Sequence, residues 1–378
     1  MNSYIVVGAI LVVLVFIFLL SIRKKRLTFT KSTYIDALHA LIEGKMDAAL
    51  DGLKKTVKND TENIQAYIVL GNIFCRQGHP IRAIKIHRNL LIRSNLSEEM
   101  INTTLQHLII DYRQADMLDK AVEMAERLAQ RKKKEEEIQR LLLSLYEEKG
   151  DWDKAFFTRQ NINKWFKTKD QNILALYKVQ SGLEFIKRGI EREARIRFRE
   201  AIKLDKKCAP AYIYWGDSYK REGRIEDAYK IWHDFTVKIP EWGHLVFDRL
   251  RDILYEMGRY GEMESIYLRV IQSRPKNPAA YLNLMDMYLK QGETDKALDE
   301  CQKILGSNPD LSPCRYIFVK VLKQKGEHEK ALDEAMQILD KVAKKAPMFY
   351  CSECGYEISE PIWYCPECHQ WNTFLGEN

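Results

Sequence analysis

The chain has 378 residues, of which 46% are hydrophobic and 30% are charged, and its formal net charge is +7. This balance is typical of a globular protein rather than a disordered one. Much of the positive charge sits in short runs that are not interleaved with aromatic residues, which argues against nucleic acid as a partner.

An uncharged apolar segment runs from Tyr4 to Ile22. As a helix, this segment would be about 28 Å long, close to the thickness of the hydrocarbon core of a bilayer. Four basic residues, 23–26, follow it directly, which reverses the charge order of a secretory signal peptide. We therefore expect residues 1–26 to form a single-pass membrane anchor with its basic flank. By the positive-inside rule the body of the protein then faces the cytoplasm.

Residues 30–346 carry an internal repeat. In the segment 211–240, Gly216, Ala228 and Pro240 stand at the spacing of a tetratricopeptide repeat, and the pattern returns both earlier and later in the chain. Nine units start near residues 30, 64, 102, 136, 175, 209, 244, 278 and 312. The sequence therefore predicts an all-α solenoid of about nine helix pairs, with an extended concave face suited to binding another chain.

Two small residues recur in eight of the nine units. An alanine opens the second helix and lets the two helices approach closely, and a glycine in the turn accepts the left-handed conformation that ends a helix. The alanines are Ala49, Ala83, Ala121, Ala155, Ala194, Ala228, Ala297 and Ala331. The glycines are Gly44, Gly78, Gly150, Gly189, Gly223, Gly258, Gly292 and Gly326.

Some units depart from this pattern. The third unit lacks the turn glycine, and the seventh has Arg251 where a small or apolar residue is expected and Met263 in place of the alanine. These departures predict either that the helices of the seventh unit splay or that this position has a functional role. Two steps of 38 and 39 residues predict longer loops or helices near residues 93–101 and 163–174, where the superhelix could bend.

The last segment, 347–378, holds four cysteines in two C-x2-C pairs: Cys351, Cys354, Cys365 and Cys368. Two such turns bring four thiolates to one point and form a tetrahedral site for one metal ion, iron or zinc. A site with four protein ligands has no open position for a substrate, so we expect a structural role. His369 is next to a ligand but surplus to the four sulfurs.

The other four cysteines are scattered singly along the repeats and are expected to be buried, unligated thiols. They are Cys75, Cys208, Cys301 and Cys314.

Aromatic residues crowd the four-cysteine segment, more than about 30 residues can bury by themselves; they include Phe349, Tyr350, Tyr356, Trp363, Tyr364 and Trp371. We therefore expect the segment to dock on the last repeat and to close one end of the concave face.

The ends of the chain carry a family resemblance. Phe349 stands two residues before Cys351, Trp363 stands two residues before Cys365, and Trp371 follows the second pair. With the apolar N-terminus and nine repeats, this signature resembles the lipopolysaccharide assembly protein B family of the bacterial inner membrane. The resemblance covers the whole chain and implies a rubredoxin-type module at its end.

The resemblance also implies a function. The family limits lipopolysaccharide synthesis by helping a membrane AAA protease to degrade the deacetylase that commits lipid A precursor to the pathway. It implies protein partners, an adaptor role and the four cysteines as functional residues, and it leaves homo-oligomers open.

The sequence also leaves alternatives. One is a rubredoxin-like electron carrier with a repeat-built docking platform, and another is a scaffold for a different membrane complex. The sequence contains no phosphate-binding loop, zinc-protease motif or nucleophile elbow, and we expect no enzymatic activity.

Overall fold

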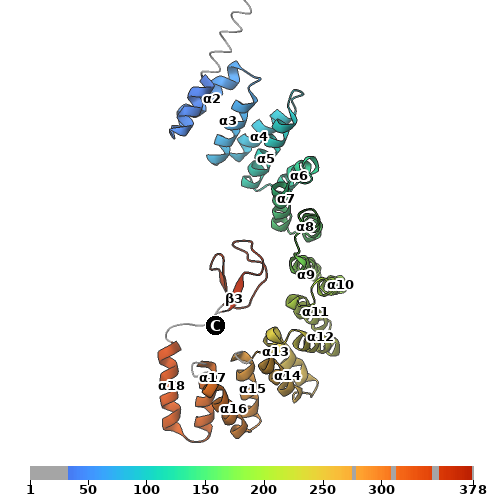
Figure 1. The fold of residues 1–378 in the computed structure, drawn as a ribbon, viewed down its shortest axis with the longest axis vertical. Coiled ribbons are helices and arrows are strands. Elements are labelled where there is room, and N and C mark those ends of the chain that lie inside the picture. Colours follow the sequence, from blue (N-terminus) through green and yellow to red (C-terminus); the bar gives the residue numbers. More distant parts are fainter. Residues whose placement is uncertain (1–32, 275–277, 308–311, 343–348, 377–378) are drawn as a thin grey trace, which may run out of the picture. The chain divides into compact units, whose positions relative to one another are not determined.

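The computed structural model describes residues 33–274, 278–307, 312–342 and 349–376 (Figure 1). The apolar segment Tyr4–Ile22 lies outside this part of the chain. Among the helices that are described, none combines the length and the apolar character needed to cross a membrane.

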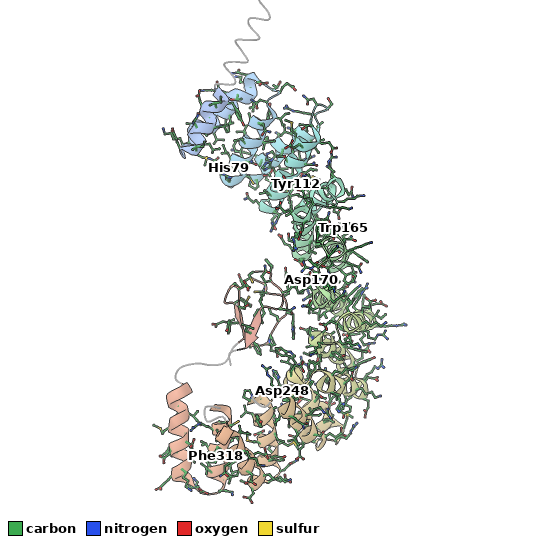
Figure 2. All side chains as sticks on the ribbon, in the orientation of Figure 1. His79, Tyr112, Trp165, Asp170, Asp248 and Phe318 are labelled. Carbon is green, nitrogen blue, oxygen red and sulfur yellow. The ribbon has the colours of Figure 1, made fainter. Side chains whose placement is uncertain are left out.

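The chain divides into two compact units, Met1–Lys167 and Thr168–Asn378. The boundary falls inside the second of the two long steps predicted from the sequence, 163–174. Figure 2 labels Trp165 near the end of the last helix of the first unit and Asp170 just before the first helix of the second.

The first unit consists of helix pairs. A helix that reaches residue 42 is followed by the remaining helices in chain order. These are α2 (Met46–Asn59), α3 (Ile64–Arg76), α4 (Pro80–Leu91), α5 (Glu98–Gln114), α6 (Leu118–Arg131), α7 (Glu136–Lys149) and α8 (Trp152–Phe166).

The second unit continues the same pairing and adds a small sheet. Its helices are α9 (Gln171–Lys187), α10 (Glu191–Leu204), α11 (Ala209–Arg221), α12 (Ile225–Lys238), the 3-10 helix η1 (Pro240–Val246), α13 (Phe247–Glu256), α14 (Glu262–Ser273), α15 (Pro278–Lys290), α16 (Thr294–Ser307), α17 (Ser312–Gln324) and α18 (His328–Val342). The strands are β1 (Phe349–Cys351), β2 (Glu357–Ile358) and β3 (Phe374–Gly376).

The predicted turn glycines adopt the predicted conformation. All eight have a positive φ, for example 79° at Gly78 and 71° at Gly223. In the third unit, which lacks this glycine, Asp116 takes the left-handed position with a φ of 56°. Aspartate is one of the few other residues that visit this region at low cost. The repeat is thus preserved where its consensus residue is missing.

The extra residues of the two long steps lengthen the helices that follow, and at the first step the connection 92–97 is also longer than the connection 205–208 before α11. Both α5 and α9 have 17 residues, whereas α3 and α11 have 13. They begin at Glu98 and Gln171, four residues before the unit starts near 102 and 175. Both steps therefore adopt the longer helix, and the first adopts a longer loop as well.

The structure shows how the seventh unit accommodates the two residues that depart from the repeat pattern. Met263 is fully buried at the position of the usual alanine. The guanidinium of Arg251 pairs with Asp248 at 2.6 Å and also donates to the side-chain oxygen of Asn283 in α15 at 3.3 Å, so it links the seventh unit to the eighth. The close approach moves instead to η1, where a Cβ on Gly243 would lie 2.6 Å from a methyl group of Val270 in α14.

Candidate metal centre

The C-terminal segment forms a small three-stranded antiparallel sheet in the order β2-β1-β3. Phe349 pairs with Ile358 on one side of β1, and Cys351 pairs with Phe374 on the other. We call residues 349–376 the ribbon. A bridge between Tyr364 and Trp371 closes the second half of the ribbon.

The two C-x2-C turns have the same backbone structure. The amide of Gly355 donates to the carbonyl of Cys351 at 2.8 Å, and the amide of His369 donates to the carbonyl of Cys365 at 3.0 Å. Gly355 has a φ of 74° and His369 a φ of 57°, so both occupy the left-handed position that completes the turn. His369 therefore serves the second turn through its backbone.

The four predicted sulfurs come together. All four Sγ atoms lie within 4.8 Å of one another. The Sγ atoms of Cys351 and Cys368 are 3.5 Å apart, and those of Cys354 and Cys365 are 3.6 Å apart. Four sulfurs around one zinc ion at about 2.3 Å lie about 3.8 Å from each other, so the cluster fits one tetrahedral metal ion.

The surroundings of Cys351 favour its thiolate form. Burial by itself raises the pKa of Cys351, but hydrogen bonds from the Thr373 hydroxyl and from the backbone amides of Cys354 and Glu353 lower the pKa to about 6. The Thr373 oxygen lies 3.1 Å from Cys351 Sγ. A thiolate at neutral pH is the form that binds metal. Thr373 is not among the site residues that the sequence predicts, because its position opposite β1 depends on the pairing of β3.

Two aromatic residues of the ribbon contact the repeats. The ring of Trp371 meets the ring of Tyr177 edge to face, with centroids 5.1 Å apart, and Tyr177 is fully buried in α9. Trp363 and Trp371 both pack against the core cluster that contains Leu176 of α9 and Ala211 of α11. The ribbon therefore docks on the first helices of the fifth and sixth units.

The prediction that the ribbon packs against the last repeat is thus wrong in its location. A signal for the true location exists in the sequence of α9, where five of the six residues from Leu174 to Val179 are apolar, and the structure buries all six. A helix that is buried on all sides needs cover on the face that its repeat partner leaves open. The ribbon supplies that cover.

A charge supports the same contact. Burial lowers the pKa of Arg249 in α13, but its hydrogen bond to Asp217 and the negative charges of Asp217 and Glu360 raise the pKa above its usual value. The Nε atom of Arg249 lies 2.7 Å from the Asp217 carboxylate. Glu360 belongs to the ribbon, so the docking combines aromatic packing with attraction between opposite charges.

The scattered cysteines are buried thiols, as predicted. Cys75, Cys208, Cys301 and Cys314 all lie in the interior. Burial raises the pKa of Cys208 to about 12 and that of Cys314 to about 11. They are therefore protonated and unreactive at neutral pH.

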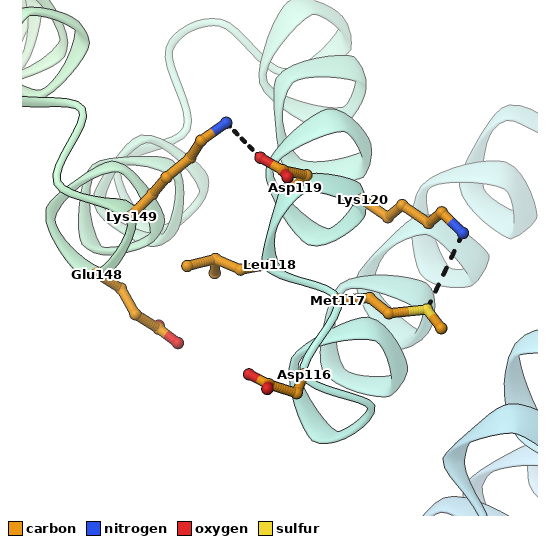
Figure 3. Close-up of a pocket in the computed structure, with 7 residues that line it drawn as sticks. All are labelled: Asp116, Met117, Leu118, Asp119, Lys120, Glu148 and Lys149. Atoms are coloured by element: carbon orange, nitrogen blue, oxygen red, sulfur yellow. Dashed lines mark hydrogen bonds and ion pairs between the residues drawn. The ribbon is translucent and has the colours of Figure 1, made fainter.

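The first unit has an open surface hollow of about 470 Å³ at the turn before α6 (Figure 3). It is lined mainly by charged side chains of both signs. Lys149 forms an ion pair with Asp119 at 2.5 Å across one edge. Lys120 points away toward the sulfur of Met117 at 4.0 Å. The hollow holds no convergent set of nucleophile, base and acid.

Comparisons with known proteins match both parts of the chain. Residues 349–375 match the family described as "Rubredoxin metal binding domain", and residues 254–316 match the tetratricopeptide repeat. Lipopolysaccharide assembly protein B of Escherichia coli strain K12 is 23% identical over 347 residues, covering 90% of this chain and 88% of the relative. The protein of the same name from Haemophilus influenzae is 22% identical over 356 residues, with the same coverage.

Among solved structures, the crystal structure of MamA protein covers 48% of this chain and 93% of its own, with 20% identity and a TM-score of 0.33.

Proposed function

We propose that this chain, a member of the lipopolysaccharide assembly protein B family, is a non-enzymatic inner-membrane adaptor that regulates lipopolysaccharide synthesis. In this proposal residues 1–26 anchor it in the membrane with its body in the cytoplasm. The repeats bind protein partners and promote degradation of the committed-step deacetylase by a membrane AAA protease.

The observation that carries the proposal is that the ribbon packs against repeats of its own compact unit, Thr168–Asn378. Stacked helix pairs offer long surfaces for other proteins, and the described residues bring together no catalytic constellation that would turn such a surface into an active site. The relatives match along both parts, with 88% of their own length covered. An adaptor needs a binding surface of this extent. A protein of unrelated function that shares only a repeat domain would not be similar to this chain over both the repeats and the ribbon.

We propose Cys351, Cys354, Cys365 and Cys368 as the ligands of one metal ion, iron or zinc. When bound, the ion supplies the folding free energy that about 30 residues lack. The chain's own part is to hold the four sulfurs by the two matching turns and to press Trp371 onto Tyr177. The metal centre then has a structural role and fixes the ribbon on the repeats.

The direct test is depletion of the protein in its own host. If the proposal is correct, the deacetylase level rises and its half-life lengthens, because the protease no longer receives it. A chain carried on a plasmid restores the short half-life, which is the matched control. An unchanged half-life contradicts the adaptor function and leaves a scaffold for another membrane complex.

One observation favours a second candidate, an electron carrier. Cys354 is exposed, so one side of the sulfur cluster faces solvent. Electron transfer needs a short distance between donor and acceptor, and a partner that binds on this side would lie close to the metal. Purified protein would then be red, bleach reversibly on reduction and lose activity when loaded with zinc. Full activity of a colourless zinc form excludes this candidate.

A further inference from the structure

The two C-x2-C turns hold their sulfurs unequally. The first cysteine of each turn is buried, with Cys351 1% and Cys365 0% exposed, whereas Cys354 is exposed and Cys368 is half-buried. Solvent and competing ligands therefore reach the cluster from the side of Cys354 and Cys368. A metal ion held by the four sulfurs would leave this outer pair first, and the inner pair would hold it longer.

The two sulfurs of the inner pair have different surroundings. The hydroxyl oxygen of Thr373 lies 3.1 Å from the Sγ atom of Cys351, and Thr373 is itself buried. The Sγ atom of Cys365 lies 3.6 Å from that of Cys354, and no hydroxyl group of the described residues is bonded to it. A hydroxyl donor thus distinguishes Cys351 from Cys365, although both are equally shielded from solvent.

The backbone of the ribbon holds this hydroxyl in place. The carbonyl of Thr373 accepts a hydrogen bond from the amide of Ser352 at 2.8 Å, and the next residue, Phe374, pairs with Cys351 where β1 meets β3. Both contacts fix the backbone of Thr373 against the first C-x2-C turn. The hydroxyl is therefore positioned by the sheet and needs little further ordering to reach the sulfur.

The hydroxyl must be the donor when metal is bound. A cysteine sulfur that binds a metal ion carries no proton, so it can only accept. Four thiolates around one divalent ion leave an excess of negative charge, and hydrogen bonds to charged acceptors are stronger than neutral ones. Loss of a residue that hydrogen-bonds to a metal ligand typically weakens metal binding by about 10–100-fold.

We propose that Thr373 is a positioning residue of the metal centre, whose hydroxyl donates to Cys351 Sγ and makes Cys351 the last ligand to release the metal. The order of release is then the outer pair, followed by Cys365 and finally Cys351. This inference rests on the four-cysteine site proposed above and does not depend on the adaptor function.

The order of release is measured on the full chain in detergent, loaded with zinc. A chelator removes the zinc slowly while an alkylating reagent traps each cysteine as it becomes free, and mass spectrometry identifies the modified positions. Cys351 is expected to be modified last. Modification of Cys351 before Cys365 would overturn the proposal and would leave the metal site itself standing.

Two substitutions separate the hydrogen bond from packing. Thr373→Val removes the hydroxyl at similar volume, so zinc should bind about 10–100-fold more weakly and Cys351 should lose its last place. Thr373→Ser keeps the hydroxyl and loses only a methyl group, so affinity and order should be unchanged. Wild-type behaviour of Thr373→Val, or a loss in Thr373→Ser, would overturn the proposal. Should Thr373→Val fail to fold, the serine variant and the unmodified chain still decide.

Cobalt in place of zinc adds a signature that packing alone would not move. The sulfur-to-cobalt charge-transfer band should shift to longer wavelength in Thr373→Val, because a sulfur without its hydrogen bond donates more charge. The band should stay in place in Thr373→Ser and in Ser352→Ala, which removes an exposed hydroxyl beside the same ligand. An unshifted band in Thr373→Val would overturn the proposal. A chain that binds neither metal would contradict the four-cysteine site as well.

Discussion

At the scale of single residues, the helix pairs depend on glycines that leave room for a ring. Gly216 of α11 faces Trp232 of α12 so closely that a Cβ would lie 2.1 Å from the indole Nε1. That Nε1 donates to the carbonyl of Ile213 at 3.1 Å, and Trp232 is fully buried. The ring therefore fills the pair and ties its two helices together.

The second repeat, formed by α3 and α4, uses the same arrangement with a histidine ring in place of the indole. His87 of α4 sits over Gly71, and its Nε2 lies 3.2 Å from the carbonyl of Ile68. A carbonyl only accepts, so Nε2 carries a proton. The other nitrogen, Nδ1, lies 2.6 Å from the Asp111 carboxylate, and this contact needs one further proton. The pair is thus a polar link, inside the core, between the second and third units.

The first prediction concerns Gly216→Ala. The new methyl group must displace Trp232 and break its hydrogen bond, so we expect a loss of about 1–3 kcal/mol from overpacking and about 1 kcal/mol from the lost bond. Thermal unfolding followed by tryptophan fluorescence measures this loss of stability.

The control for this prediction is Gly306→Ala in α16, where nothing lies within 4 Å of the added methyl group. There the higher helix propensity of alanine should leave stability unchanged or raise it by up to about 1 kcal/mol. Equal destabilisation by both substitutions would show that the contact with Trp232 is not the cause.

At the scale of elements, the ribbon and α9 complete each other. The ribbon is too small to bury its aromatic residues alone, and α9 has no exposed side between Leu174 and Val179. Trp371 and Tyr177 meet where these two needs coincide. Loss of the ribbon should therefore destabilise α9 and α11 rather than the last helices of the chain.

The second prediction tests this link with Cys351→Ser combined with Cys354→Ser. The variant should lose its metal, because two of four ligands are gone, and the ribbon should unfold. Hydrogen exchange should then accelerate in α9 and α11, whose apolar cover is removed, and stay unchanged in α17 and α18.

Ser352→Ala is the matched control for the cysteine variant. Ser352 lies between the two ligands and is exposed, and its described hydrogen bond comes from its backbone amide to Thr373. This control should keep metal and exchange rates. Faster exchange confined to α17 and α18 in the cysteine variant would contradict the docking site.

At the scale of the whole molecule, the chain combines two compact units built of repeats with a metal-binding end, and we propose an anchor at its start. The anchor lies in residues 1–26, outside the described part of the chain. Its proposed role is to bring the repeats to a protease in the same membrane, where effective concentration replaces tight binding. Among the described residues, the buried cores of both units lie after residue 36, so we expect the body to fold without the anchor.

The third prediction follows from this division of roles. Deletion of residues 1–22 should move the protein to the soluble fraction with its metal content and melting temperature unchanged, and should abolish control of the deacetylase level. Fractionation, metal analysis and immunoblotting measure these properties. Replacement of the segment by an unrelated apolar span of equal length should restore control. Full control by the soluble fragment would show that anchoring is dispensable.

The sequence by itself determined the features that depend on local spacing. The helix pairs, the left-handed turn glycines and the gathering of Cys351 with the other three cysteines follow from residues less than one repeat apart, whose geometry the backbone imposes. Tertiary structure alone decided the docking of the ribbon on α9 and the exposure of Leu332. These depend on which surfaces are left uncovered once the repeats have stacked, and such surfaces are set by residues far apart in the chain.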